Sequence, residues 1–321
     1  MKNFPGAGDA IVGRNALASA GITPGVLKPF DVLVEHGGNP DAVAAKLRSV
    51  PGVAAAAAPK AWRSGPDSIV EAFPTVDGAA SGIQPIIDRV HATLKGTNAT
   101  LGGVAAADRD FVHAVYGNFP YVLTFVIVLT LILLARAFRS IVLPIKAAIL
   151  NLVSLGAAFG IIVFIFQWGH GSSLWNISAT QAITAWIPLM IFAFLFGLSM
   201  DYEVFMLTRM REAYDETGST EKAIELGLAR TGKLVTSAAL VLMFAFLVLS
   251  ASPGFEVKEF AIGLAAGIIF DATVIRALLV PAIMRLLGRT NWWMPAWAKS
   301  VLFIKQREGR PELEVAAEKA A

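Results

Sequence analysis

The sequence predicts a membrane protein in which a bundle of five transmembrane helices follows an N-terminal α+β domain of the ferredoxin-like type. Of the 321 residues, 55% are hydrophobic and only 16% are charged, whereas soluble domains have about 25% charged residues. Long apolar stretches fill the later part of the chain, and the first part alternates short strand and helix patterns. The chain has no cysteine, which excludes disulfides and thiol ligands.

Residues 1–117 have the pattern of a ferredoxin-like domain. Asn39 is a suitable N-cap, and Pro40 after it favours the first turn of a helix. Apolar residues from Ile83 to Leu94 recur at helical spacing, which predicts an amphipathic helix. The resulting order, β-α-β-β-α-β, is that of a split βαβ fold. Strands are expected at 30–34, 53–58, 68–73 and 99–104, helices at 39–50 and 81–94, and a helix leading into the membrane at 105–117.

The transmembrane domain is expected within residues 118–287. Most of its apolar stretches reach the ~20 residues that a helix needs to cross the hydrocarbon core. A short amphipathic helix at 221–229 is expected to lie at the membrane surface. Residues 288–321 are expected to form a tail in which Trp292, Trp293 and Trp297 anchor the last span at headgroup level. The spans are expected at about 120–135, 141–166, 183–207, 234–249 and 260–286.

The distribution of Lys and Arg predicts the orientation of the chain. Basic residues are concentrated in the connections after the first and third spans and in the tail, and they are scarce in the other two connections. Since basic loops face the cytoplasm, we expect a cytoplasmic tail and an extracytoplasmic N-terminal domain. A long N-terminal domain does not cross a membrane easily without a preceding signal or span, so an upstream transmembrane helix is expected.

The main candidate site is the stretch 197–205, Gly-Leu-Ser-Met-Asp-Tyr-Glu-Val-Phe. Asp201 is the first charge in the third apolar stretch, and an ionisable group at membrane depth marks a path for ions, protons or substrate. Tyr202 can donate a hydrogen bond to that carboxylate. Gly197, one turn earlier, would let a neighbouring helix approach closely. On these residues alone, a proton relay and a structural ion pair are equally supported.

The last span contains a second set of candidates. Asp271 and Arg276 are five residues apart, which is about 140° around an α-helix, so each is expected to pair with another helix rather than with the other. Arg276 could instead extend toward the cytoplasmic surface. Gly263 and Gly267 form a GxxxG pattern, which predicts close helix packing.

Two further charged residues are expected to have structural roles. Glu203 lies about 200° around the helix from Asp201 and is expected to pair with Lys233 or Arg209. Lys146, near the start of the second span, is expected to extend to the inner membrane surface. The sequence has no glycine-rich phosphate loop, nucleophile elbow or zinc-ligand spacing. We therefore expect no enzyme activity, metal or cofactor.

Four blocks of the sequence resemble MmpL-type transporters of the RND (resistance-nodulation-division) superfamily. They are the stretch 197–205, residues 227–232 (Gly-Leu-Ala-Arg-Thr-Gly), residues 270–282 from Phe-Asp-Ala-Thr-Val-Ile-Arg to Val-Pro-Ala, and residues 291–295 (Asn-Trp-Trp-Met-Pro). The resemblance implies an RND half-bundle with a porter subdomain. It corresponds to the C-terminal one of two pseudo-repeated halves, without that half's opening span. A separate N-terminal half or a homo-oligomer would then be needed.

The resemblance also implies a function: proton-motive-force-driven export of lipids or other hydrophobic compounds across the bacterial cytoplasmic membrane. Asp201 and Tyr202 would form the proton relay, and Asp271 and Arg276 would be coupling positions. The expected partners are protons, a hydrophobic substrate, the membrane and the other half, with no nucleic acid and no cofactor. The alternatives are a non-transporting lipid-sensing or scaffold protein, and an inactive fragment of a split transporter gene.

Overall fold

The computed structural model describes residues 9–78, 80–171 and 182–302. It divides into two compact units, residues 1–122 and 123–321, which are described separately below.

The first unit contains an antiparallel sheet in the order β2-β4-β1-β5, with the short strand β3 paired to β4. The predicted order β-α-β-β-α-β is confirmed, and so is the ferredoxin-like class of the domain. The strands are β1 (Phe30–Val34), β2 (Val53–Ala57), β3 (Arg63–Ser64), β4 (Asp67–Pro74) and β5 (Ala99–Gly102). The helices are α1 (Asp9–Ser19), α2 (Pro40–Arg48) and α3 (Gln84–Leu94), with short 3-10 turns η1 (Pro24–Leu27), η2 (Lys60–Trp62) and η3 (Ser81–Ile83).

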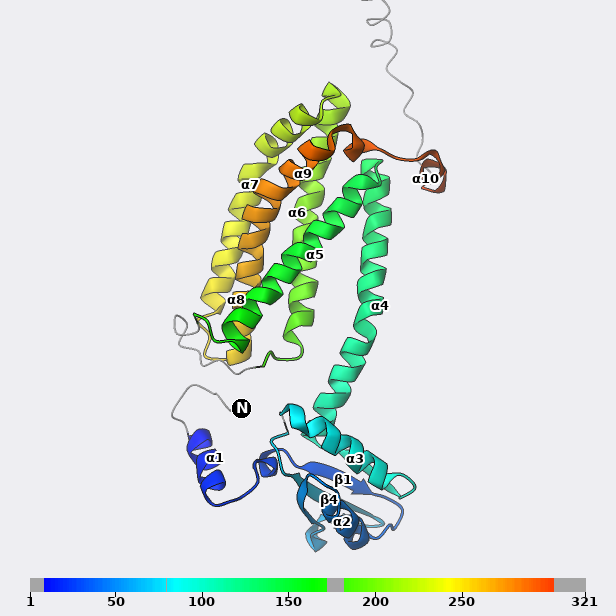
Figure 1. The fold of residues 1–321 in the computed structure, drawn as a ribbon, viewed down its shortest axis with the longest axis vertical. Coiled ribbons are helices and arrows are strands. Elements are labelled where there is room, and N and C mark those ends of the chain that lie inside the picture. Colours follow the sequence, from blue (N-terminus) through cyan, green and yellow to red (C-terminus); the bar gives the residue numbers. More distant parts are fainter. Residues whose placement is uncertain (1–8, 79, 172–181, 303–321) are drawn as a thin grey trace, which may run out of the picture. The chain divides into compact units, whose positions relative to one another are not determined.

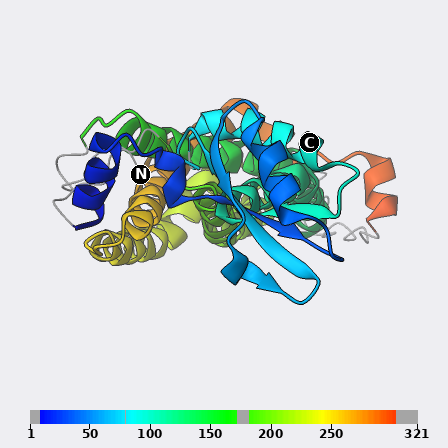
Figure 2. The same cartoon turned by 90° about the horizontal axis from the view of Figure 1, so that it is seen from below.

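Local chemistry explains this arrangement. The Asn39 side chain accepts hydrogen bonds from the first two backbone N–H groups inside α2, which satisfies donors that a helix start leaves free. Alternate residues of β1, namely Phe30, Val32 and Val34, are buried, because successive strand residues point to opposite faces. These residues share one hydrophobic core with the apolar sides of α2 and α3, which cover the sheet (Figure 2).

The second unit contains the apolar helices, the first of which, α4, begins in the first unit and continues into the second. Within the described residues, five helical segments are long and apolar enough to cross a membrane, and the chain is a multi-pass membrane protein. The segments are α4 (Val104–Phe138), α5 (Val142–Ile162) continued by η4 (Val163–Gln167), α6 (Ile187–Thr217), α7 (Thr220–Leu249), and α8 (Phe255–Phe270) continued by η6 (Asp271–Leu279) and α9 (Val280–Leu287). The turn η7 (Gly288–Trp292) and α10 (Ala296–Val301) follow.

Helices α5 to α9 pack against one another, whereas residues 123–138, the part of α4 in this unit, make few contacts with them (Figure 1). Large side chains of α4, such as Phe125 and Leu133, are exposed within this chain. The end of α4 is held by the tail, because Arg136 donates a hydrogen bond to the Leu302 carbonyl at 2.7 Å. The lead-in helix and the first span, which were expected as separate stretches, form one continuous helix around Pro120.

The expected surface helix at 221–229 is not a separate element. It forms the start of α7, and the only break after α6 is a two-residue turn. Gly218 ends α6 in the left-handed conformation (φ 66°), and the Ser219 side chain caps α7 by accepting from the Lys222 N–H. The sequence prediction was wrong because charged residues were taken as the end of a helix, whereas here both helices extend beyond their apolar part.

Candidate functional site

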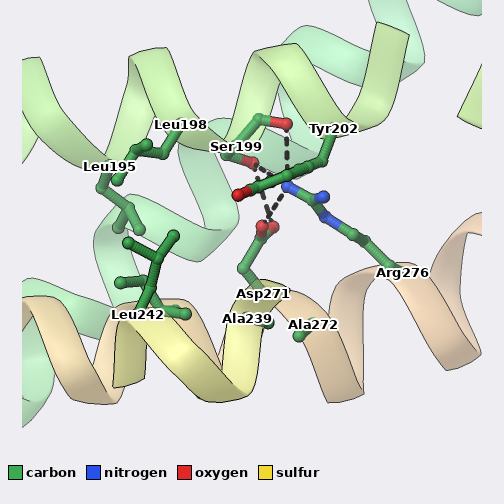
Figure 3. A pocket seen from close by; sticks show the side chains of 10 residues that line it. Leu195, Leu198, Ser199, Tyr202, Ala239, Leu242, Asp271, Ala272 and Arg276 are labelled. Atoms are coloured by element: carbon green, nitrogen blue, oxygen red, sulfur yellow. Dashed lines mark hydrogen bonds and ion pairs between the residues drawn. The ribbon is translucent and has the colours of Figure 1, made fainter. Parts of the chain in front are cut away.

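A buried polar network joins α6 to the last membrane segment. The Ser199 hydroxyl of α6 donates a hydrogen bond to Asp271 Oδ1 at 3.1 Å. Arg276 donates to the Ser199 carbonyl at 2.7 Å and forms an ion pair with Asp271. The guanidinium also lies over the Tyr202 ring, 5.1 Å from its centroid. Figure 3 shows these four side chains converging from two helices.

The network is almost closed to solvent. The exposed fractions are 3% for Ser199, 5% for Asp271 and 4% for Arg276. A cavity of about 10 Å³ is lined by these residues and by apolar side chains of α6, α7, α8 and η6, and that space is close to what one water needs. Charges at such depth are costly unless they are paired, and here each charge has the other as its partner.

The pairing of Asp271 with Arg276 corrects the sequence prediction that they lie on different sides of the helix. That prediction assumed 100° per residue, as in an α-helix. Residues Asp271–Leu279 instead form a π-helix, in which backbone hydrogen bonds link residues i and i+5. Positions five apart therefore align, and Arg276 folds back onto Asp271. Sequence reasoning also missed Ser199, although it is a polar residue within an apolar run and lies inside the stretch 197–205.

Asp201 lies outside this network. It is exposed within the chain, as is Gly197 four residues earlier. A Cβ atom added at Gly197 would meet nothing within 4 Å, so no helix of this chain packs there. Tyr202 is half-buried, and its recorded contact is with Arg276 rather than with Asp201. Asp201 and Tyr202 are thus adjacent in sequence but face different surroundings.

Lys146 and Glu203 correct a second prediction. Lys146, on α5, is 6% exposed and Glu203, on α6, is 3% exposed, so neither extends to the membrane surface. The two side chains attract each other electrostatically. Glu203 is also attracted by Arg276 and repelled by Asp271. Lys146 lies beside Ile283 and Leu287 of α9. Nearby, the chain after α9 is joined to the start of α5, where the Ser140 hydroxyl donates to the Asn291 carbonyl at 2.6 Å. That long-range contact is not visible in the sequence.

Gly263 and Gly267 lie where α8 passes close to α5 and α6. A Cβ atom at Gly263 would come within 2.5 Å of Ile162 and 2.6 Å of Ile191. At Gly267 it would come within 2.8 Å of Leu195. A larger residue at either position would therefore require the ends of these side chains to move.

Trp292, which was predicted to anchor the last span, is buried within the chain. Its ring stacks on Tyr214 with 4.2 Å between centroids, and its Nε1 donates to the Thr220 hydroxyl at 3.0 Å. It therefore ties the end of α6 to the start of α7. Trp293 and Trp297 are 56% and 67% exposed, as interfacial anchors would be. In the part of the chain that the structure describes, no group of three His, Asp or Glu side chains is arranged to bind a metal ion.

Comparison with known proteins identifies the family. The family model described as "MMPL family" matches residues 71–309, a range that begins within β4 and includes the whole buried network. The chain belongs to the MMPL family. The matched range contains all four sequence blocks that resemble the family. MMPL proteins are membrane transporters of the RND type.

Several MMPL proteins are similar to this chain. "Heme uptake protein MmpL11" of Mycobacterium tuberculosis (strain ATCC 25618 / H37Rv) is 33% identical over 316 residues, which is 94% of this chain and 32% of the relative. "Mycolic acid-containing lipids exporter MmpL11" of Mycolicibacterium smegmatis is 34% identical, over 90% of this chain and 32% of the relative. "Trehalose monomycolate exporter MmpL3" of the same species is 40% identical, over 70% and 22%. The chain spans about a third or less of the length of these relatives.

Proposed function

We propose that this chain is half of a proton-motive-force-driven exporter of lipids or other hydrophobic compounds in the bacterial cytoplasmic membrane, without enzymatic activity. The observation that supports this most is the buried network of Ser199, Tyr202, Asp271 and Arg276. It connects the helix that presents Asp201 to a second helix with paired charges at membrane depth. Ionisable groups in such a position are a signature of proton pathways.

In the proposed mechanism, Asp201 takes a proton from the extracytoplasmic side and releases it to the cytoplasm. The electrical part of that transfer supplies about 2.3 kcal/mol per charge per 100 mV. Neutralising Asp201 changes the forces on α6, and α6 holds Arg276 through Ser199 and the Tyr202 ring. The second helix therefore responds to the charge of Asp201, and the porter domain moves with the bundle.

The π-helix Asp271–Leu279 supplies this coupling with a two-state element. Conversion of a π turn to an α turn displaces the following residue by one position, or about 100° around the axis. Such a conversion would move Arg276 away from Asp271 and break the network. Proton binding and release would then correspond to two packings of α6 against the last segment.

The exposure of Asp201 supports the need for a partner. A carboxylate facing lipid at membrane depth is unfavourable, so Asp201 and the bare surface at Gly197 should be covered by protein. We propose that the cover is an equivalent half, supplied by a separate N-terminal half or by a second copy of this chain. Residues 1–117 are proposed to be the extracytoplasmic porter domain, with residues 288–321 in the cytoplasm.

The cargo class follows from the relatives. Two of them are named as exporters of mycolic-acid-containing lipids and of trehalose monomycolate, and one is named for heme uptake. All of these cargoes are amphiphiles with a large apolar part. We therefore propose an amphiphilic hydrophobic cargo for this chain.

The test is transport of a fluorescent long-chain lipid by the assembled transporter in vesicles with an imposed pH gradient. Asp201→Asn should abolish gradient-driven transport, because the carboxamide cannot release a proton. Glu216→Gln is the matched control, since Glu216 is an exposed carboxylate farther along α6. Undiminished transport by Asp201→Asn would contradict the proposal.

A further inference from the structure

A third buried carboxylate, besides Asp271 and Glu203, lies on α8, far from the network just described. Glu259 has no exposed surface. Its Oε2 accepts a hydrogen bond from the Thr184 backbone N–H at 3.3 Å, and Thr184 lies three residues before the start of α6. Its Oε1 is buried and has no hydrogen-bond partner among the residues that the structure describes. A buried acceptor left in this way costs free energy, and more so if the group is ionised.

The surroundings of Glu259 contain little that could neutralise a negative charge. The parts of α5, α6 and α7 that pack at this level, residues 147–167, 187–200 and 234–249, have no Asp, Glu, Lys, Arg or His. The charged neighbours on α8 itself are Glu256, which is exposed and of like charge, and Lys258, the adjacent residue. His170 is exposed and stacks on Phe164. A carboxylate of Glu259 would therefore be poorly compensated, whereas a carboxylic acid fits the dry packing.

Glu259 and Asp271 are the two ends of one helix interface. They belong to a row on α8 with a spacing of four residues, and Gly263 and Gly267 are the two members between them. Each member of the row meets the same neighbouring helix, α6, or the residues just before it. Glu259 meets Thr184, Gly263 meets Ile191, Gly267 meets Leu195, and Asp271 meets Ser199.

The middle of this interface is apolar and tightly filled. The side chains of Ile162, Ile191 and Leu195 occupy the space above the two glycines. The two carboxyl groups are separated by about 18 Å along the helix axis. A proton therefore does not pass directly from one to the other in this conformation, and the two ends of the interface communicate through the packing of α6 on α8.

We propose that Glu259 is a second proton-binding site of the transport cycle, at the extracytoplasmic end of the interface between α6 and α8. This inference rests on the proposed function and on the proposed orientation. One proton from extracytoplasmic water adds to the carboxylate and forms a carboxylic acid, whose O–H is on Oε1. Loss of that proton restores a carboxylate, which needs to be hydrated. This end of the interface must therefore open to water when the proton is released. Proton binding at Glu259 thus closes the start of α6 onto α8.

The first test is spectroscopic and does not depend on transport. Infrared spectra of the full chain in lipid are recorded at about pH 7, where a protonated carboxyl gives a C=O stretching band distinct from that of a carboxylate. We expect Glu259→Gln to lose one such band, and Glu256→Gln, the exposed control three residues earlier, to keep it. Identical spectra for the wild type and Glu259→Gln would overturn the proposal.

A second variant serves as the control for misfolding. Glu259→Asp keeps a carboxyl group on a shorter side chain, so its band should persist at a shifted frequency. Loss of the band in Glu259→Asp while its thermal unfolding matches that of the wild type would also overturn the proposal.

The second test separates this site from the relay. Transport by the assembled protein is measured against extracytoplasmic pH. We expect Glu259→Gln to lose one step of the pH dependence while it still transports, and Asp201→Asn to lose gradient-driven transport altogether. A wild-type pH profile in Glu259→Gln refutes the role of Glu259. Gradient-driven transport in Asp201→Asn refutes the proposed function instead, and leaves the infrared result for Glu259 standing.

Discussion

Replacing Arg276 by Met is the sharpest test of the buried network. The substitution keeps an unbranched apolar stem and removes the guanidinium with its charge. It leaves Asp271, which is only 5% exposed, without its cation. Removing one member of a buried ion pair costs about 3–5 kcal/mol, because the remaining charge is uncompensated. The hydrogen bonds from Arg276 to Ser199 are lost as well. We therefore expect a fall in unfolding free energy at the upper end of that range.

A rescue substitution separates the ion pair from general packing. In the double variant Arg276→Met with Asp271→Asn, no buried charge remains, and the Ser199 hydroxyl can still donate to the amide oxygen. The double variant should therefore recover about 2–3 kcal/mol relative to the sum of the single variants. The matched control is Arg285→Met, because the pair of Arg285 with Glu221 is 78% and 74% exposed and should contribute little.

The assay is equilibrium unfolding of the full chain in mixed micelles with a denaturing detergent, followed by far-ultraviolet circular dichroism. The reasoning is refuted if Arg276→Met destabilises no more than Arg285→Met. It is also refuted if the two single-variant effects simply add in the double variant, since that would show that the charges do not interact.

Three further predictions use the same unfolding assay. Gly263→Val should destabilise by about 1–3 kcal/mol through overpacking, whereas Gly197→Ala should be neutral in the isolated chain because no atom lies within 4 Å. Trp292→Ala should cost about 3–5 kcal/mol, because the ring's stacking and hydrogen bond are lost. Burial and the facing Asp31 raise the pKa of Glu71 above 4.5. The sheet should therefore lose stability as pH rises through that pKa, and Glu71→Gln should flatten this dependence.

Much of the fold could be predicted because its signals are local. The strand 30–34 follows from alternation, and the start of α2 follows from the capping chemistry of Asn39 and Pro40. The membrane spans could be predicted because the length of each apolar stretch can be compared with the thickness of a bilayer. The limits of α6 and α7 were less predictable, because charge density indicates where a membrane ends and not where a helix does.

The site was less predictable because its geometry depends on non-local packing and on an irregular helix. Asp271 and Arg276 were identified as candidates, but their pairing depends on a π-helix that the 100° rule does not anticipate. Lys146 lies beside Ile283 and Leu287 of α9, which are far away in the sequence. For Asp201, the sequence identified a charge within an apolar stretch, but only the structure shows that its surface is uncovered within this chain.

The most direct test of the central claim is cargo-dependent proton flux through the assembled transporter in vesicles, measured with an internal pH-sensitive dye. The account predicts that cargo movement and proton flux rise together, that both stop in Asp201→Asn, and that both stop when an ionophore collapses the gradient. Cargo movement that continues without a proton gradient, or that continues in Asp201→Asn, would contradict it.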